Sequence, residues 1–192
     1  MGISRISRAI VWLLFFWLPW STAFPQLTKE DWQHAESAIV RLGPGDFPDL
    51  PADVRTVLEQ RGCTVPQPYN AGVQKRNVVS GQFTAVGQTE WAVLCSHEKR
   101  SAILVFRGAH PDQVDRLAEE ADAQYLQVVH GEREIGYSRQ LTVASPKLVR
   151  RRFSKGTLRT ADHDGIENIF LGKASVVWYR SGGKWISTPA GD

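Results

Sequence analysis

Residues that carry chemistry in recognisable patterns are scarce in this chain. It has two cysteines, one methionine and five scattered histidines, and neither cysteine has a C-x-x-C or C-x-x-H neighbour. The sequence contains no G-x-S-x-G, S-x-x-K, P-loop or G-x-G-x-x-G motif. These absences exclude the familiar signatures of serine hydrolases, nucleotide-binding proteins and zinc fingers. We therefore expect a domain that is not an enzyme and that holds no cofactor or metal.

A hydrophobic run long enough for a membrane helix is also missing. The longest run, Ala9 to Leu18, has ten residues, and at 1.5 Å each it spans about half of a ~30 Å hydrocarbon core. Arg5 and Arg8 precede the run, and the small residues Ser21 to Ala23 follow it. This order predicts a signal peptide at residues 1–23, cleaved after Ala23. A membrane anchor is the alternative, but we expect no stable span after cleavage.

Strong charge of either sign is absent from the predicted mature chain, residues 24–192. The full chain has 23 basic and 20 acidic residues, and the leader removes two arginines and no acid, which leaves a net charge of +1. We therefore expect no nucleic-acid partner. The remaining 169 residues suit a single globular domain, exported to the periplasm or secreted.

The two cysteines, Cys63 and Cys95, both lie in the predicted mature chain. An even number of cysteines in an exported protein predicts a disulfide. Closing a loop of that length stabilises the fold by about 3 to 4 kcal/mol in the chain-entropy model. Two separate buried thiols are the alternative.

Helix signals are concentrated in the first part of the mature chain. Capping residues and apolar spacing predict a helix at Lys29 to Leu42, and a second helix that begins at Pro51 and ends at Gly62. A third helix is predicted after Pro111, with an apolar face made by Val114, Leu117, Ala118 and Ala121.

Short β-rich runs dominate the rest of the chain. They predict strands at 91–96, 102–106, 125–129, 135–143, 148–153, 174–179 and 184–187, with hairpins joining the first two and the last two. Residues 64–74 read as a loop. The expected fold class is α+β, with an antiparallel sheet of about six to eight strands and two or three short helices, mostly N-terminal.

The segment from Gly81 to Leu94 has a G-x-F motif, a second glycine four residues after the phenylalanine, and then an apolar strand. It resembles one FG-GAP or VCBS-type repeat of the β-propeller proteins. In that family the loop binds calcium through alternate carboxylates. Here Gln82, Thr84 and Val86 stand at those places and only Glu90 is charged, so we expect no calcium. A single copy also does not make a propeller, and the resemblance implies only a strand, a tight turn and a strand.

Acidic residues and a histidine gather near the C-terminal hairpin: Asp162, His163, Asp164 and Glu167. On a helix, His163 and Glu167 would share a face, as zinc ligands can. A metal-dependent hydrolase that uses this cluster is therefore the alternative function. The simpler interpretation is a loop at Asp164 and Gly165 that enters a short helix, since no second histidine lies at ligand spacing.

A basic segment without any acidic residue runs through Lys147, Arg150, Arg151, Arg152, Lys155 and Arg159. If residues 148–153 form a strand, Arg150 and Arg152 lie on one face of it. Such a patch suits an anionic component of the cell envelope or another exported protein. The simpler interpretation is a charged edge strand that resists aggregation.

As a whole the layout resembles that of exported bacterial proteins: a leader, short helices, a cysteine after a helix, and a β-rich half that ends in Gly183-Lys184-Trp185. The resemblance carries no known activity. We therefore favour a non-enzymatic exported domain, of a binding or inhibitor-like kind.

Overall fold

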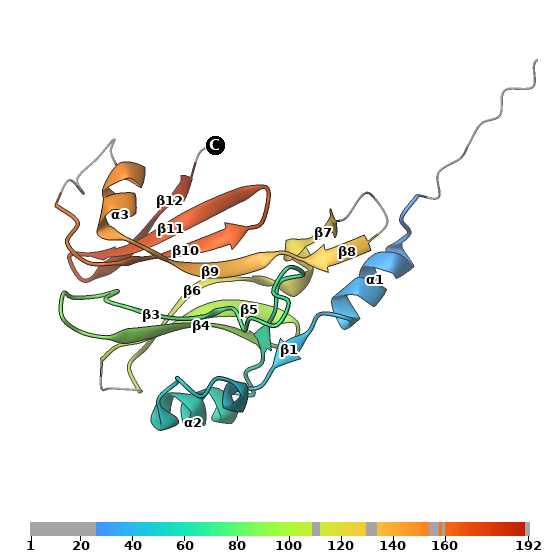
Figure 1. The fold of residues 1–192 in the computed structure, drawn as a ribbon, viewed down its shortest axis with the longest axis horizontal. Helices are drawn as coiled ribbons and strands as arrows, with labels where there is room; N and C mark the ends of the chain where they lie inside the picture. The colour runs from blue at the N-terminus through green and yellow to red at the C-terminus, as the bar shows by residue number, and fades with distance from the viewer. Residues whose placement is uncertain (1–25, 109–111, 130–133, 154–157, 159, 191–192) are drawn as a thin grey trace, which may run out of the picture.

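The structure, a computed structural model, describes residues 26–108, 112–129, 134–153, 158 and 160–190 (Figure 1). The predicted signal peptide lies outside these residues. The described part begins with helix α1 (Lys29–Ser37), where Thr28 and Asp31 form a capping box. The hydrogen bonds from Thr28 lower the pKa of the Asp31 carboxyl. The helix ends before the predicted Leu42, because Ile39 leaves it to enter the core and strand β1 (Arg41–Leu42) pairs with β2 (Val65–Pro66).

Helix α2 (Ala52–Gln60) confirms the second predicted helix. Pro51 is its N-cap rather than its first helical residue, and the chain turns beyond it at Gly62, with a φ of 63°. A short 3-10 turn, η1 (Pro44–Asp46), precedes it. Val54 and Leu58 are the buried residues of the helix, and they pack on one face of the first sheet.

The first four-stranded sheet is an antiparallel meander of β3 (Val78–Gly81), β4 (Glu90–His97), β5 (Arg100–Phe106) and β6 (Val114–Ala121). The β4–β5 hairpin confirms the prediction. Its two turn residues, Glu98 and Lys99, both have positive φ, as a two-residue hairpin turn of type I′ requires.

The helix predicted after Pro111 is wrong, because Val114–Ala121 is strand β6. A shift of register between Ser101 and Ile103 of β5 marks an irregularity, and Ala118 has a φ of 48°. Such a bulge interrupts the two-residue alternation of a strand. As a result, the apolar residues 114, 117, 118 and 121 have a spacing that imitates a helix.

The second four-stranded sheet is another antiparallel meander: β9 (Arg139–Ala144), β10 (Gly165–Phe170), β11 (Ala174–Ser181) and β12 (Lys184–Ala190). The final predicted hairpin is confirmed by β11 and β12. The strand predicted at 135–143 is divided into β8 (Glu134–Tyr137), which pairs with β7 (Leu126–Val129), and β9. A 3-10 turn, η2 (Asp122–Tyr125), connects β6 to β7.

The strand predicted at 148–153 is also wrong, because Pro146–Arg152 is helix α3. The Ser145 hydroxyl accepts a hydrogen bond from the Leu148 N–H at 3.3 Å, and Pro146 occupies the first helical position. Serine followed by proline is a helix start signal. It outweighs the β propensity of the valine and phenylalanine that follow.

The two sheets pack face to face, with α2 on the outer face of the first and α3 on the outer face of the second (Figure 1). β4 shows this directly, because Ala92 and Leu94 point into the core between the sheets while Val93 and Cys95 point towards α2. The α+β class is thus confirmed in outline. The described residues hold twelve strands, more than the six to eight expected, and α3 is not N-terminal.

A buried arginine joins the two sheets. Arg139, at the start of β9, has no exposed surface. Its Nη1 donates to the carbonyl and hydroxyl of Ser101 at 3.0 and 2.8 Å, and its Nη2 donates to the carbonyl of Ala118 at 2.6 Å. Its Nε donates to Oδ1 of Asn168 at 3.0 Å, and the guanidinium lies 4.5 Å from the ring centroid of Tyr125. The cation is thus solvated by protein dipoles and a ring.

We expect Arg139→Met to lower the free energy of unfolding by about 3 to 5 kcal/mol, because it fills the space but leaves buried acceptors of three neighbours without donors. Urea unfolding measures the change. Arg151→Met, at an exposed position of α3, is the control and should stay within about 0.5 kcal/mol of wild type. An Arg139→Met protein as stable as the control would contradict this account of the core.

Candidate functional site

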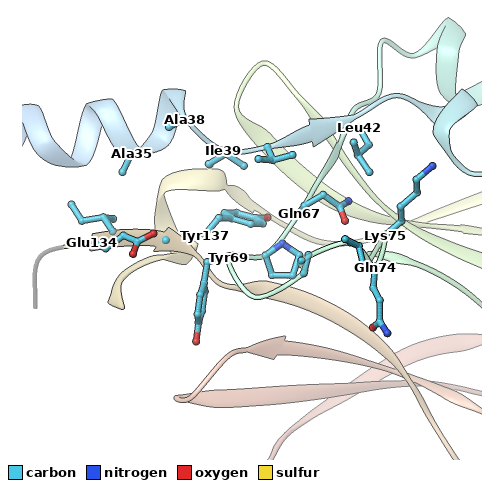
Figure 2. A pocket seen from close by; sticks show the side chains of 17 residues that line it. Ala35, Ala38, Ile39, Leu42, Gln67, Tyr69, Gln74, Lys75, Glu134 and Tyr137 are labelled. Atoms are coloured by element: carbon cyan, nitrogen blue, oxygen red, sulfur yellow. The ribbon is translucent and has the colours of Figure 1, made fainter. Parts of the chain in front are cut away.

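A groove of about 580 Å³ is hollowed into the described surface (Figure 2). The end of α1 and the residues that follow it form one wall, residues 67–75 form the other, and β8 lines it from Glu134 to Tyr137. Figure 2 shows Lys75 and Glu134 towards opposite ends, with Tyr69 and Tyr137 between them. The volume is within the range of about 300 to 1,000 Å³ that is typical of ligand pockets.

Exposed apolar side chains are concentrated at this groove. Among the described residues, six large hydrophobic side chains are exposed, and three of them line it: Val40, Tyr69 and Val73, with 60, 38 and 101 % of their surface accessible. Single exposed hydrophobic residues need no explanation, whereas a contiguous group marks an interaction site. The groove is therefore the strongest candidate site.

The groove wall at residues 67–75 is held by the buried side chain of Gln67. Its amide nitrogen donates to the carbonyls of Val65 and Arg76, both at 3.1 Å, and its amide oxygen accepts from the Arg76 N–H at 2.7 Å. The Gln67 N–H donates to the Val40 carbonyl at 2.8 Å, across the groove wall. The side-chain bonds hold the two ends of the loop together at Val65 and Arg76. The backbone bond to Val40 attaches the loop to the segment that follows α1. The groove is thus pre-formed rather than created by a ligand.

Tyr137 contributes an uncharged surface to the groove. Burial raises the pKa of its phenol well above the ordinary value, so the group stays protonated at any physiological pH. The charged residues that line the groove are Lys75 and Glu134. A ligand at the middle of the groove therefore meets apolar and neutral groups.

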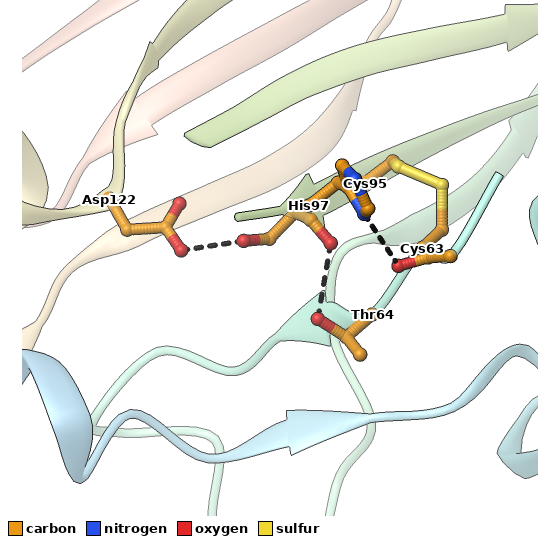
Figure 3. Close-up of a disulfide and its surroundings, with 7 residues drawn as sticks. Cys63, Thr64, Cys95, His97 and Asp122 are labelled. Carbon is orange, nitrogen blue, oxygen red and sulfur yellow. Dashed lines mark hydrogen bonds between the residues drawn. A yellow bond between two sulfur atoms is a disulfide. The ribbon is translucent and has the colours of Figure 1, made fainter. Parts of the chain in front are cut away.

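The structure joins the two cysteines by the predicted disulfide (Figure 3). Cys63 and Cys95 have Cα atoms 5.2 Å apart, and the bond ties the end of α2 to β4. Next to it, the backbones of Thr64 and Ser96 exchange hydrogen bonds of 2.9 and 2.7 Å, and the Ser96 hydroxyl donates to Asp122 at 2.6 Å. The bond is part of the frame that carries the groove wall at residues 67–75.

The predicted acidic cluster is not gathered into one site. His163 is buried and stacks on Tyr179, with ring centroids 4.3 Å apart and planes 12° from parallel. The Asp164 carboxylate accepts from the Gln82 N–H at 3.0 Å, and the Asp164 N–H donates to the Gln82 carbonyl at 2.9 Å. Asp162 lies beside the Tyr179 hydroxyl, at 3.5 Å. These contacts attach the loop after β3 to the second sheet.

Glu167 is separate from that group because Gly165–Phe170 is strand β10 and not a helix. The expected helical face shared by His163 and Glu167 is therefore wrong. Glu167 instead accepts from the hydroxyls of Ser175 at 2.6 Å and Thr142 at 3.3 Å on the neighbouring strands. Within the described ranges, no three histidine, cysteine, aspartate or glutamate side chains are placed to hold a metal ion.

The basic segment lies on α3, so the strand face expected to hold Arg150 and Arg152 is wrong. Lys147, Arg150 and Arg151 are exposed, and Arg150 donates to the Ala161 carbonyl. The three arginines occupy the last helical turn, where positive charge is favourable beside the helix carbonyls. Lys155 and Arg159 lie outside the described residues.

The segment from Gly81 to Leu94 forms the end of β3, a turn, and the first part of β4. Glu90 is fully buried, and its carboxylate accepts from the Thr84 N–H at 2.6 Å and from the Thr84 hydroxyl. Glu90, the one acidic residue of this segment, thus holds the turn at Thr84 with its buried carboxylate.

Two smaller hollows also lie on the described surface. One, of about 360 Å³, lies beside Tyr125, Asn168 and Phe170, and the other, of about 400 Å³, lies beside Cys95 and several arginines. In the second, Glu119 bridges Arg116 and Arg100 at 2.9 and 3.2 Å, and these bonds lower the pKa of its carboxyl. Two of its three arginines are thus already paired with an acid.

Comparison of the chain with protein-family models, with curated proteins and with solved structures finds no match. The functional argument therefore depends on the geometry of the groove.

Gly136 on β8 controls how closely Tyr69 approaches the strand. A Cβ at this position would lie 2.7 Å from the Tyr69 Cβ and 3.1 Å from Cγ2 of Val129. We expect Gly136→Ala to destabilise the fold by about 1 to 3 kcal/mol, because one of these neighbours must move. Urea unfolding measures the change, and Gly45→Ala is the matched control, since nothing lies within 4 Å of its added Cβ. Equal stability of the two variants would show that Tyr69 is not held against β8.

Proposed function

We propose that this protein is an exported, non-enzymatic binding module that takes an apolar ligand or segment into the groove between α1, residues 67–75 and β8. The observation that carries the proposal is the concentration of exposed Val40, Tyr69 and Val73 at one pre-formed hollow. Covering these side chains removes apolar surface from water, which favours binding by about 25 cal/mol for each Å².

The chemistry of the groove supports binding rather than catalysis. The described residues that line it include no histidine, cysteine, serine, threonine or aspartate. Lys75 and Glu134, its two charged residues, lie towards opposite ends (Figure 2). A nucleophile with an adjacent base is the minimum arrangement for covalent catalysis, and the lining residues do not supply it.

Export is supported by the leader pattern at residues 1–23 and by the disulfide between Cys63 and Cys95. None of the helices in the described part of the chain is both long and apolar enough to cross a bilayer. We propose the periplasm or the external medium as the site of action.

One mass measurement tests both parts of the export proposal. We expect the protein recovered from the exported fraction to begin at Phe24 and to weigh two hydrogens less than the chain 24–192 with free thiols. Reduction should restore the two hydrogens. A full-length chain, or a mature chain with two free thiols, would count against export as proposed.

The groove itself is tested with an uncharged, environment-sensitive dye such as Nile red. We expect the double variant Val40→Asn and Val73→Asn to bind the dye more than tenfold more weakly, since about 2 kcal/mol of apolar burial is lost. The matched control is Val86→Asn with Val143→Asn, two exposed valines that do not line the groove. Dye titration by fluorescence gives the affinities, and urea unfolding checks that both proteins remain folded. Equal dye binding by the two double variants would remove the groove as the site.

A further inference from the structure

Strand β8 has one edge that no strand of the described residues covers. It pairs antiparallel with β7, with Leu126 opposite Tyr137 and Val128 opposite Ile135. The Tyr137 carbonyl accepts from the Tyr69 N–H at 2.7 Å, on the side away from β7. Backbone groups change direction at every residue of an antiparallel strand, so the N–H and C=O of Ile135 also point away from β7. No described residue forms a hydrogen bond with either group.

This free edge opens into the groove, because Glu134, Ile135, Gly136 and Tyr137 all line it. The unpaired backbone groups of Ile135 thus lie where the exposed apolar side chains gather. The Tyr69 N–H already occupies the neighbouring place at Tyr137, so an added segment pairs with β8 at Ile135 alone and its first residue turns away from the strand at Tyr69. A ligand that offers both apolar side chains and a backbone N–H and C=O satisfies the groove better than a purely apolar one.

We propose that the groove is a strand-addition site: an extended peptide segment of a partner protein pairs antiparallel with β8 at Ile135. This inference rests on the proposed function and names the class of ligand. The central residue of the segment donates its N–H to the Ile135 carbonyl and accepts from the Ile135 N–H. Antiparallel pairing is the slightly more stable arrangement, and all the described sheets use it.

The walls of the groove suit the alternating side chains of such a segment. One set of side chains meets Ala35, Ala38 and Ile39 at the end of α1, and the other set meets Tyr69 and Val73. Small and β-branched apolar residues fit these walls, and β-branched residues favour the extended conformation.

The charges at the two ends give the segment a direction. Lys75 lies beyond the Tyr137 end of β8, and Glu134 begins the strand, so the two ends of the groove have opposite charge (Figure 2). Within the described ranges Lys75 donates to a backbone carbonyl, that of Asp46, and forms no ion pair there. An antiparallel segment therefore places an acidic residue first, near Lys75, and a basic residue last, near Glu134.

The test uses the whole mature protein and synthetic five-residue peptides with blocked ends, so no folding defect enters. We expect acetyl-Glu-Val-Val-Val-Lys-amide to displace Nile red, and the reversed peptide acetyl-Lys-Val-Val-Val-Glu-amide to bind more weakly. Methylation of the central valine nitrogen should weaken binding at least tenfold, because it replaces the N–H that faces Ile135. Methylation of a neighbouring valine nitrogen, which points away from β8, is the matched control and should have a smaller effect.

The outcomes separate this inference from the proposed function. If the dye binds at the groove but none of the peptides displaces it, the groove binds apolar ligands and strand addition is wrong. Equal loss on methylation at the central and neighbouring nitrogens likewise overturns pairing at Ile135. If the dye itself does not depend on Val40 and Val73, the proposed function fails first. Tighter binding by the reversed peptide overturns the antiparallel direction.

Discussion

The packing of the two sheets depends on a buried cation that forms no ion pair with a carboxylate in the described part of the chain. The guanidinium of Arg139 donates to groups on β5, β6 and β10 and lies over the ring of Tyr125 in η2. Removing a charge from water is costly unless its donors are matched, and here two carbonyls, a hydroxyl and an amide oxygen accept four hydrogen bonds from the guanidinium. The geometry of these acceptors is fixed by the strands themselves, including the β6 residue with positive φ, Ala118. The arginine therefore specifies how the sheets meet.

The groove depends on the same junction. The chain that leads into Arg139 is β8, and the Ser138 N–H donates to the Tyr125 carbonyl at 2.8 Å, beside the ring on which the guanidinium lies. Asn77, buried and with a φ of 71°, donates to the Arg139 carbonyl and accepts from the Leu141 N–H, which attaches β9 to the chain that follows the groove wall. The same hydrogen bonds around Arg139 thus hold both the core and the groove. They fix the position of β8 and of its free edge.

Local signals in the sequence predicted those elements whose formation is decided locally. The hairpins at 91–106 and 174–187 and the helix that follows Pro51 have turn and capping residues within a few positions, and all three are present. Wrong predictions came from long-range constraints or from a missed cap. At β6 the pairing with β5 overrides helical spacing, and at α3 the Ser145 and Pro146 start signal outweighs strand propensity. The groove was not predicted, since residues 64–74 read only as a loop and nothing in the sequence reveals that Gln67 is buried or what it bonds.

The sequence by itself determined the α+β class, the antiparallel hairpins and the pairing of its two cysteines, because each follows from composition or from residues close along the chain. Tertiary structure alone decided that Arg139 is buried. It also decided that the residues of the acidic cluster serve as separate structural contacts: Asp162, His163, Asp164 and Glu167. Only the tertiary structure brings Val40, Tyr69 and Val73 together at one groove. These residues lie far apart in sequence or on elements whose type depends on their neighbours. Their meeting is therefore a property of how the sheets pack, which no local pattern encodes.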